Sequence, residues 1–311
     1  MLLAIAIGYA IRRGSTCAVG AVSELVLHGR ARRFMSFLLC SGIVAMVLLP
    51  AGWFSERWGG LLPSHSAAWT SAVGGALFGI GAVINGACNF GTIDKLGCGE
   101  TRYLMLFPGL FVGASFGPIL DLPRPDVTGS LIGDINLISI GWIVFCLAMV
   151  IAFWIASVRR KQQRGTPGKP VAAYLSVIGG LGAVITLAIG PWHYTRIAVS
   201  ASENWSSSLF IEVGELIGLF CAVIVGAVIA SIQKDCFRLQ WPTFTGALTC
   251  FVGGVFMGTA ILLIPGGNEG MIFSGIPSLS PSAAIAYPAM CATIAILVWT
   301  SSRMERTATA P

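Results

Sequence analysis

The sequence predicts an all-α polytopic membrane protein with about nine hydrophobic helices, short broken or re-entrant helices and two inverted repeats. Of the 311 residues, 55% are hydrophobic and only 10% are charged, and the mean hydropathy is +0.82. Soluble domains carry about 25% charged residues, so this chain cannot cover a water-facing surface. The 39 glycines suit helices that pack closely in lipid. An internal duplication, described below, gives the third observation.

Composition also excludes several classes of protein. The net charge of +6 lies mostly in short loops, where it indicates topology and not a nucleic-acid partner. The nine cysteines are scattered through apolar segments and follow neither the spacing of a zinc site nor that of a secreted disulfide framework. There is no evident cleavable signal peptide. We therefore expect no catalytic centre, metal or cofactor, and no nucleic-acid partner.

The hydrophobic segments are distributed along the whole chain. Residues 1–11 are apolar but too short to span a bilayer, which needs about 20 residues. They stop at Arg12 and Arg13, and a second short helix runs to about Leu27. The basic loop 159–169 is expected in the cytoplasm by the positive-inside rule. The predicted spans are 34–53, the broken segment 67–84, 103–119, 137–157, 171–190, 210–231, 244–264 and 281–300.

A constant offset of 179 residues reveals an internal duplication. Span 34–53 leaves a basic loop, whereas its partner 213–232 enters one, so the two copies are expected to be inverted. We predict a first repeat at 1–120, a connector at 121–170 and a second repeat at 171–311. Nine identities fall within residues 63–91: Pro63, Ala68, Thr70, Val73, Gly74, Gly75, Gly79, Asn89 and Gly91 match Pro242, Ala247, Thr249, Val252, Gly253, Gly254, Gly258, Asn268 and Gly270.

Four turns at helix breaks are predicted to converge near the membrane midplane: 12–20, 85–100, 191–205 and 264–279. A broken backbone at that depth is tolerated only where it is buried in protein or lines a wet path. Helix N-termini there offer unpaired N–H groups and a positive dipole end, which suit an anion. The polar residues of these turns are Thr16, Cys17, Asn85, Cys88, Asn89, Thr195, Asn268 and Glu269, and the glycines that allow close approach are Gly86, Gly91, Gly266 and Gly267.

The cysteines divide by position. Cys17 and Cys88 lie at helix breaks beside glycines and small polar residues, where a thiol can face a path, so we interpret both as functional. For Cys98, in a glycine-rich charged hinge, packing and function are both open. Five others are interpreted as structural, as most buried cysteines are: Cys40, Cys146, Cys221, Cys250 and Cys291. Cys236 is expected in a cytoplasmic loop, with no partner in sequence.

Two acidic residues are related by the repeat. Glu24 and Glu203 match at the same offset, and intramembrane ionisable residues are functional candidates by default. A structural role, such as helix capping or an ion pair with Arg12 or Arg196, is the interpretation we favour.

These residues resemble the YeeE/YedE sulfur-transport family across nearly the whole chain. The resemblance rests on Gly14–Ala21, Asn85–Thr92, Pro265–Gly270 and Gly275–Pro281 with Ala286 and Tyr287. It implies a multi-pass bacterial inner-membrane protein that takes up thiosulfate, with an hourglass-shaped interior and cysteine thiols that hand the ion inward. By motif, Cys17 and Cys88 match the first two such thiols. The sequence departs at a third, because Gly267 is the repeat equivalent of Cys88 and no cysteine occurs in 264–279.

We therefore predict a permease, not an enzyme, for thiosulfate or a related sulfur or selenium species. The alternative is a membrane-embedded subunit whose Cys88 carries a persulfide for a soluble sulfurtransferase. Besides the anion, we expect membrane lipid and a candidate soluble sulfurtransferase on the cytoplasmic side as partners. The predicted path residues are Cys17, Cys88, Asn85, Asn89, Thr16, Gly86, Gly91, Gly266, Gly267, Asn268 and Cys98.

Overall fold

A computed structural model describes residues 1–55, 62–116, 125–164, 171–193, 195, 197–198, 209–264 and 266–308. The described chain is helical apart from one pair of very short strands. It contains eight helical runs long and apolar enough to cross a membrane: Leu2–His28, Arg32–Phe54, Trp69–Gly97, Leu137–Ala156, Val171–Ile189, Gly214–Ile232, Phe244–Leu263 and Pro281–Met304. The predicted class, an all-α polytopic membrane protein, is confirmed.

The first half of the chain consists of long apolar helices and of shorter helices separated by breaks. The elements of the first half are α1 (Leu2–Gly14), α2 (Ala18–His28), α3 (Arg32–Phe54), α4 (Trp69–Asn85), α5 (Asn89–Gly97), the 3-10 turn η2 (Thr101–Met105) and α6 (Leu106–Ala114). Two of the apolar runs are each a pair of helices, α1 with α2 and α4 with α5, interrupted at the predicted breaks. The sequence signal for a break is therefore local and reliable here: glycine and small polar residues inside apolar sequence.

The second half follows α8 (Leu137–Arg164). Its elements are α9 (Val171–Ile189), α11 (Leu209–Ile232), α12 (Phe244–Leu263), α13 (Gly267–Gly270), the π-helical turn η3 (Met271–Gly275) and α14 (Pro281–Ala308). Most of the predicted turn 191–205, including Arg196, Ser202 and Glu203, lies outside the described residues, so their predicted roles stay predictions.

The closest helix pairs each join one helix of the first half to one helix of the second half. Helix α1 packs against α11 while α3 packs against α9, and α12 packs against α6 while α4 packs against α14. Under the offset of 179 residues, α1, α3, α4 and α6 correspond to α9, α11, α12 and α14. Each cross-pair therefore has its counterpart, which is the pattern of a pseudo-two-fold axis between the halves.

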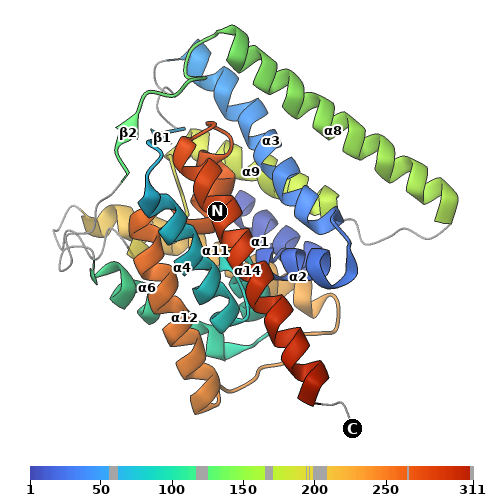
Figure 1. Ribbon diagram of the computed structural model, residues 1–311, viewed down its shortest axis with the longest axis vertical. Coiled ribbons are helices and arrows are strands. Elements are labelled where there is room, and N and C mark those ends of the chain that lie inside the picture. The colour runs from blue at the N-terminus through green and yellow to red at the C-terminus, as the bar shows by residue number, and fades with distance from the viewer. Residues whose placement is uncertain are drawn as a thin grey trace.

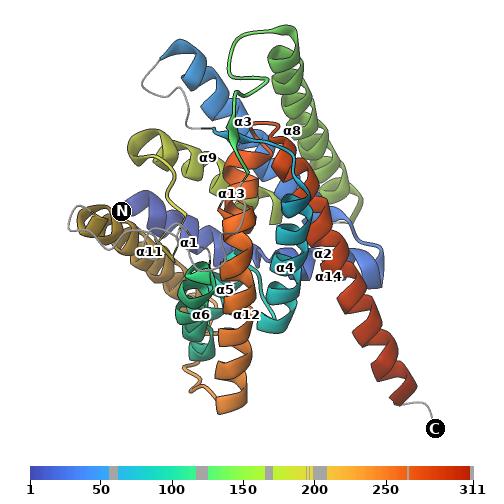
Figure 2. The same ribbon diagram turned by 60° about the vertical axis from the view of Figure 1, so that its left-hand side comes forward.

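The helices α4 and α12 lie side by side (Figures 1 and 2). Gly74 lies against Ala260, and the equivalent of Gly74, which is Gly253, lies against Gly81, the equivalent of Ala260. A Cβ atom on Gly253 would lie 2.8 Å from the carbonyl oxygen of Gly81, so only glycine permits this approach. Because residue numbers rise along one helix as they fall along the other, α4 and α12 are antiparallel, as inverted repeats require.

Helix α8 has no counterpart in the other half. It packs against α3 at the edge of the molecule, and most of its length is exposed (Figure 1). Its exposed side chains include Leu137, Val144, Phe145 and Trp154, which suits a lipid-facing connector. The boundaries drawn at 120/121 and 170/171 fall in or beside residues outside the description and stay a prediction.

The predicted span 103–119 is described only in part. The chain forms η2 and the nine-residue α6 over 101–114, and residues 117–119 lie outside the description. Glycines on one face of α6 bring it against α12: a Cβ on Gly113 would clash with the backbone carbonyl of Val255. The described part of this segment is therefore helical and packs closely on α12, and its full length stays a prediction.

Two-residue strands join the loops at one end of the molecule. Strand β1 (Ser64–His65) pairs antiparallel with β2 (Val127–Thr128), with Ser64 opposite Thr128 and His65 opposite Val127. His65 is also held by α14, because its N–H donates to the Ser280 hydroxyl at 3.0 Å and its carbonyl accepts from the same hydroxyl at 3.3 Å. These contacts fix the loop above the second helix break.

Candidate functional site

Two thiols from separate helix breaks lie in contact at the centre of the first half. Cys17 is the residue before α2 and Cys88 is the residue before α5, and both have extended backbone angles. Their Sγ atoms are 3.8 Å apart, and the N–H of Ala18 donates to the Cys88 Sγ at 3.0 Å. Each thiol therefore stands at the N-terminus of a helix, where unpaired N–H groups favour negative charge.

Glycines leave room for this pair. A Cβ atom on Gly91 would lie 2.6 Å from the Sγ of Cys17, so no larger residue fits there without moving the thiol. Gly86 ends α4 in a left-handed conformation with φ of 76°, and its N–H donates to Val83. Gly91 is therefore required by the space beside the Cys17 thiol, and Gly86 by the left-handed turn that ends α4.

Buried asparagines surround the helix breaks. Asn85 donates to the carbonyl of Ala87 at 2.7 Å and to the Thr92 hydroxyl at 3.1 Å, but its own Oδ1 accepts no hydrogen bond. Asn89 and Asn268 are fully buried, and neither amide group makes a hydrogen bond of good geometry, although the Asn89 amide lies beside the carboxyl group of Glu269. Leaving a buried polar atom unpaired costs about 1–3 kcal/mol, so these three side chains are unusual in a folded interior.

The break in the second half meets the break in the first. Gly266 and Gly267 both have positive φ, 76° and 59°. A Cβ on Gly267 would lie 3.6 Å from the Nδ2 atom of Asn89, which places the first α5 residue against the second-half turn. Thr195 donates to the carbonyl of Gly266 at 3.3 Å. The predicted turns 85–100 and 264–279 therefore meet at Asn89 and Gly267, whereas most of the turn 191–205 lies outside the described residues.

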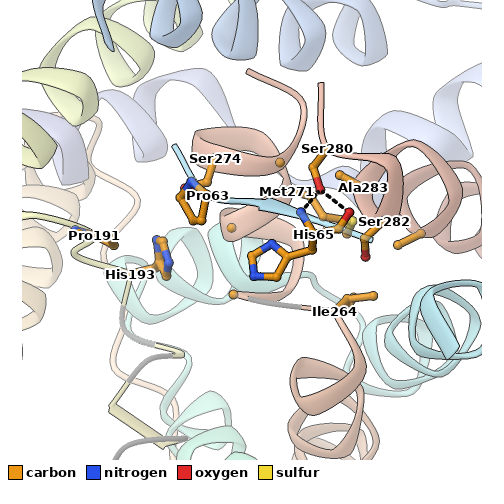
Figure 3. A pocket seen from close by; sticks show the side chains of 14 residues that line it. Pro63, His65, Pro191, His193, Ile264, Met271, Ser274, Ser280, Ser282 and Ala283 are labelled. Atoms are coloured by element: carbon orange, nitrogen blue, oxygen red, sulfur yellow. Dashed lines mark hydrogen bonds between the residues drawn. The ribbon is translucent and has the colours of Figure 1, made fainter. Parts of the chain in front are cut away.

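Two small cavities lie beside the second-half turn. The larger, about 90 Å³, is lined by His65, His193, Gly266 and Gly270 among others, and Figure 3 shows both imidazole rings at its walls. The smaller, about 20 Å³, is lined by Glu269 and by Ile11, Ile93 and aromatic residues, with His193 again at its edge. The interior thus has space on the His65 side of the break, while the thiols themselves are packed.

An ionic network closes the opposite end. The guanidinium of Arg12, at the end of α1, donates to Asp94 on α5 at 2.9 Å, to the Ser231 hydroxyl on α11 at 2.7 Å and to the Cys236 thiol at 3.0 Å. Cys98 is close to Arg12 and Ser231. Burial raises the pKa of the Cys98 thiol, and the positive charge of Arg12 opposes that shift.

Three predicted residues are placed differently from the rest of the group. Cys98 follows α5, about 15 Å from Cys88 at 1.5 Å per helical residue, so it belongs to the Arg12 network and not to the thiol pair. Thr16 is buried but bonds locally, with its hydroxyl 3.4 Å from the carbonyl of Ile11. Glu24 pairs with Arg33 at 3.3 Å and Arg12 with Asp94, so the suggested Glu24–Arg12 pair is wrong.

Sequence reasoning missed a group on α14. The phenol of Tyr287 lies near the thiols of Cys88, Cys40 and Cys291. The sequence alone favours a structural role for Cys291. However, Cys291 follows Tyr287 by about one helical turn, so the two side chains share one face of α14. The spacing of an aromatic hydroxyl and a thiol at i and i+4 was the available signal. Glu269 was named among the polar residues of the turns but not among the path residues.

Comparisons with known proteins show the family of this chain. Residues 13–296 match the sulphur transport family. The chain is also similar to the thiosulfate transporter TsuA of Escherichia coli (strain K12), with 21% identity over 285 residues that cover 81% of this chain and 79% of the relative. Since the family match spans most of the sequence, this multi-pass membrane protein belongs to the sulphur transport family.

Proposed function

We propose that this protein is a permease of the bacterial inner membrane that takes up thiosulfate or a closely related sulfur oxyanion. The proposed path runs past the thiols of Cys17 and Cys88 and the unpartnered amides of Asn85, Asn89 and Asn268. The observation that supports this proposal most directly is that two thiols, each at a helix N-terminus, lie 3.8 Å apart near those amides. Family membership and the similarity to a thiosulfate transporter support the choice of substrate.

The chemistry of the groups fits a divalent sulfur anion. An ion that crosses hydrocarbon must exchange its water shell for protein groups, and backbone N–H, amide N–H and S–H donors do this without a fixed positive charge that would hold it. Thiols are weak donors and weak acceptors, which suits a polarisable terminal sulfur better than a hard oxygen. Arg12, the cation at the nearby network, is paired with Asp94 and so is partly neutralised.

The buried position of Cys88 favours transport over a persulfide carrier. Its side chain has no exposed surface, and a soluble sulfurtransferase has to reach the sulfur atom that it accepts. Mass spectrometry of the purified protein tests this directly: we expect no stable extra sulfur on Cys88. A stoichiometric persulfide there would support the carrier and a sulfurtransferase partner on the cytoplasmic side.

Uptake of labelled thiosulfate into proteoliposomes tests the proposed function. Wild-type protein should take up the label, and unlabelled thiosulfate should compete strongly. Sulfate in the same excess should compete weakly, because it lacks the terminal sulfur. Sulfite and selenium oxyanions in parallel competitions define the substrate range. No uptake above that of empty liposomes, or equal competition by sulfate and thiosulfate, would contradict the proposal.

A further inference from the structure

The second helix break contains a carboxyl group without a charge partner. Glu269, on α13, is 2% exposed, and its Oε2 atom is buried with no hydrogen-bond partner. The polar side chain that interacts with this carboxyl group is the amide of Asn89, across the interface between the two halves. A carboxyl group held in this way has no evident structural task, since it caps no helix and joins no ion pair among the described residues.

Glu269 faces the space between the outer end and the centre of the molecule. It lines the smaller cavity of about 20 Å³, which is otherwise mostly apolar and aromatic. His193 lines this cavity and also the larger one of about 90 Å³, which opens beside His65 (Figure 3). The positive-inside rule places the His65 loop outside, because α3 begins at a basic loop and ends before this strand. A proton from the outer water thus has a titratable group, His193, between it and Glu269.

Among the residues that the structure describes, no charged group forms an ion pair with Glu269. His193 is the titratable neighbour in the same cavity. On α1 and α5 the next ionisable groups are Arg12 and Asp94, which follow the lining residues Ile11 and Ile93 and are paired with each other. The lining residues of α11 and η3 are Phe220, Val223 and Phe273. An ionised carboxylate in such surroundings is strongly disfavoured, so Glu269 carries a proton in this conformation.

We propose that Glu269 is the proton-binding group that couples entry of the sulfur oxyanion to entry of a proton. This inference rests on the proposed function and adds its driving force. The inside-negative membrane potential opposes the entry of a dianion, so a proton taken up with it reduces the charge that must move. The carboxylate takes the proton from water of the outer cavity and returns it to water on the inner side, and no electrons or other groups change hands.

Proteoliposomes with the membrane potential clamped at zero test the coupling. The quantity measured is the stimulation factor, which is thiosulfate accumulation with an acid-outside gradient of one pH unit divided by accumulation without it. Coupling to one proton per ion predicts a factor of about ten for the wild type, since one pH unit corresponds to a tenfold ratio. Glu269→Gln replaces the carboxyl group by an amide that cannot ionise, so its factor should fall to about one. Glu269→Asp keeps an ionisable group and should retain stimulation.

A matched control is Glu215→Gln, which changes an exposed carboxyl group on α11 and should keep the wild-type factor. A dye for internal pH gives an independent readout: adding thiosulfate outside should acidify the lumen with the wild type and with Glu215→Gln, but not with Glu269→Gln. Equal stimulation of wild type and Glu269→Gln would overturn the proposal. So would loss of all uptake in both Glu269→Gln and Glu269→Asp, because Glu269 would then serve the fold or the path itself.

The two proposals fail in different ways. If the wild type takes up thiosulfate with no stimulation by the gradient and no lumenal acidification, only the proton coupling is wrong. If the wild type neither takes up nor exchanges thiosulfate, the proposed function is wrong and the coupling falls with it.

Discussion

The thiols of Cys17 and Cys88 lie 3.8 Å apart although 71 residues separate them in the chain. The contact arises because both residues precede short helices, α2 and α5, that start at the same depth in the first half. Ala18, the first residue of α2, donates its N–H to the sulfur of Cys88. The start of one helix therefore polarises the thiol of the other, and the two breaks form one unit.

Removing either thiol should impair transport without unfolding the protein. A hydrogen bond to a charged group contributes about 1.5–3 kcal/mol, so Cys17→Ala or Cys88→Ala should lower thiosulfate uptake by about tenfold to a hundredfold. The matched control is Cys146→Ala, which removes an equally buried thiol from the contact between α3 and α8. Initial uptake rates in proteoliposomes with equal protein content provide the measurement. Wild-type rates for both single variants would rule out the thiol path.

A methyl group at Gly91 should displace the Cys17 thiol and so impair transport. The new Cβ would lie 2.6 Å from the Cys17 sulfur, so the thiol has to move, and overpacking of this kind costs about 1–3 kcal/mol. We expect Gly91→Ala to lose most of its uptake while its thermal stability falls modestly. Gly141→Ala on α8 is the control, since its Cβ meets no atom within 4 Å. If both variants transport equally well, the space beside Cys17 has no role in the path.

Much of this arrangement was predictable from the residues because it depends on local signals. Glycine beside small polar residues within apolar sequence marked the breaks at 12–20 and 85–91, and the offset of 179 residues related Asn89 to Asn268. The antiparallel contact of α4 with α12 follows from that repeat. These features are set by backbone chemistry and pattern, both of which are visible in one sequence.

Other features depend on which side chains meet in space, and no local pattern encodes that. Asp94 is the partner of Arg12, 82 positions away in the chain, and no local pattern links the two. Tyr287 approaches Cys88 only because α14 packs against helices of the first half.

The pseudo-two-fold axis predicts paired effects of glycine substitutions. A Cβ on Gly75 would meet the backbone oxygen of Ala286, and one on its equivalent Gly254 would meet that of Leu106 at 2.5 Å. Gly75→Ala and Gly254→Ala should therefore destabilise the protein alike, by about 1–3 kcal/mol each. Melting temperatures in detergent measure this, with Gly180→Ala on α9 as a control that meets no atom within 4 Å. A clear difference between the two variants would argue against equivalent packing.

His65 should make stability depend on pH. Partial burial lowers the pKa of its imidazole below the usual value of about 6.5, so the unfolded chain binds a proton more readily than the folded one. The contribution to stability is thus complete above pH 6.5 and declines as the pH falls through the lower, folded-state pKa. We expect the wild type to lose more melting temperature between pH 7.5 and pH 5 than His65→Gln does. Parallel curves for the two proteins would contradict this assignment.

The Arg12–Asp94 pair is predicted to hold the inner end of the first half together. Both side chains are mostly buried, with exposures of 13% and 12%, and Arg12 also joins Ser231 and Cys236 near the end of α11. Breaking a buried pair by removing one partner costs about 3–5 kcal/mol, because the other charge is left uncompensated. Asp94→Asn should therefore lower the melting temperature strongly.

Removing both charges distinguishes a specific pair from two independent effects. Arg12→Gln with Asp94→Asn leaves no unpaired charge, so the double variant should be less destabilised than the sum of the single variants, by about 1–3 kcal/mol. Reaction of Cys98 with a charged thiol reagent gives a second readout. Since Cys98 lies beside Arg12, Asp94→Asn should speed this reaction if the network closes the inner end, whereas Glu215→Gln should not. Additive destabilisation together with unchanged labelling would show that the three helices are held there by packing alone.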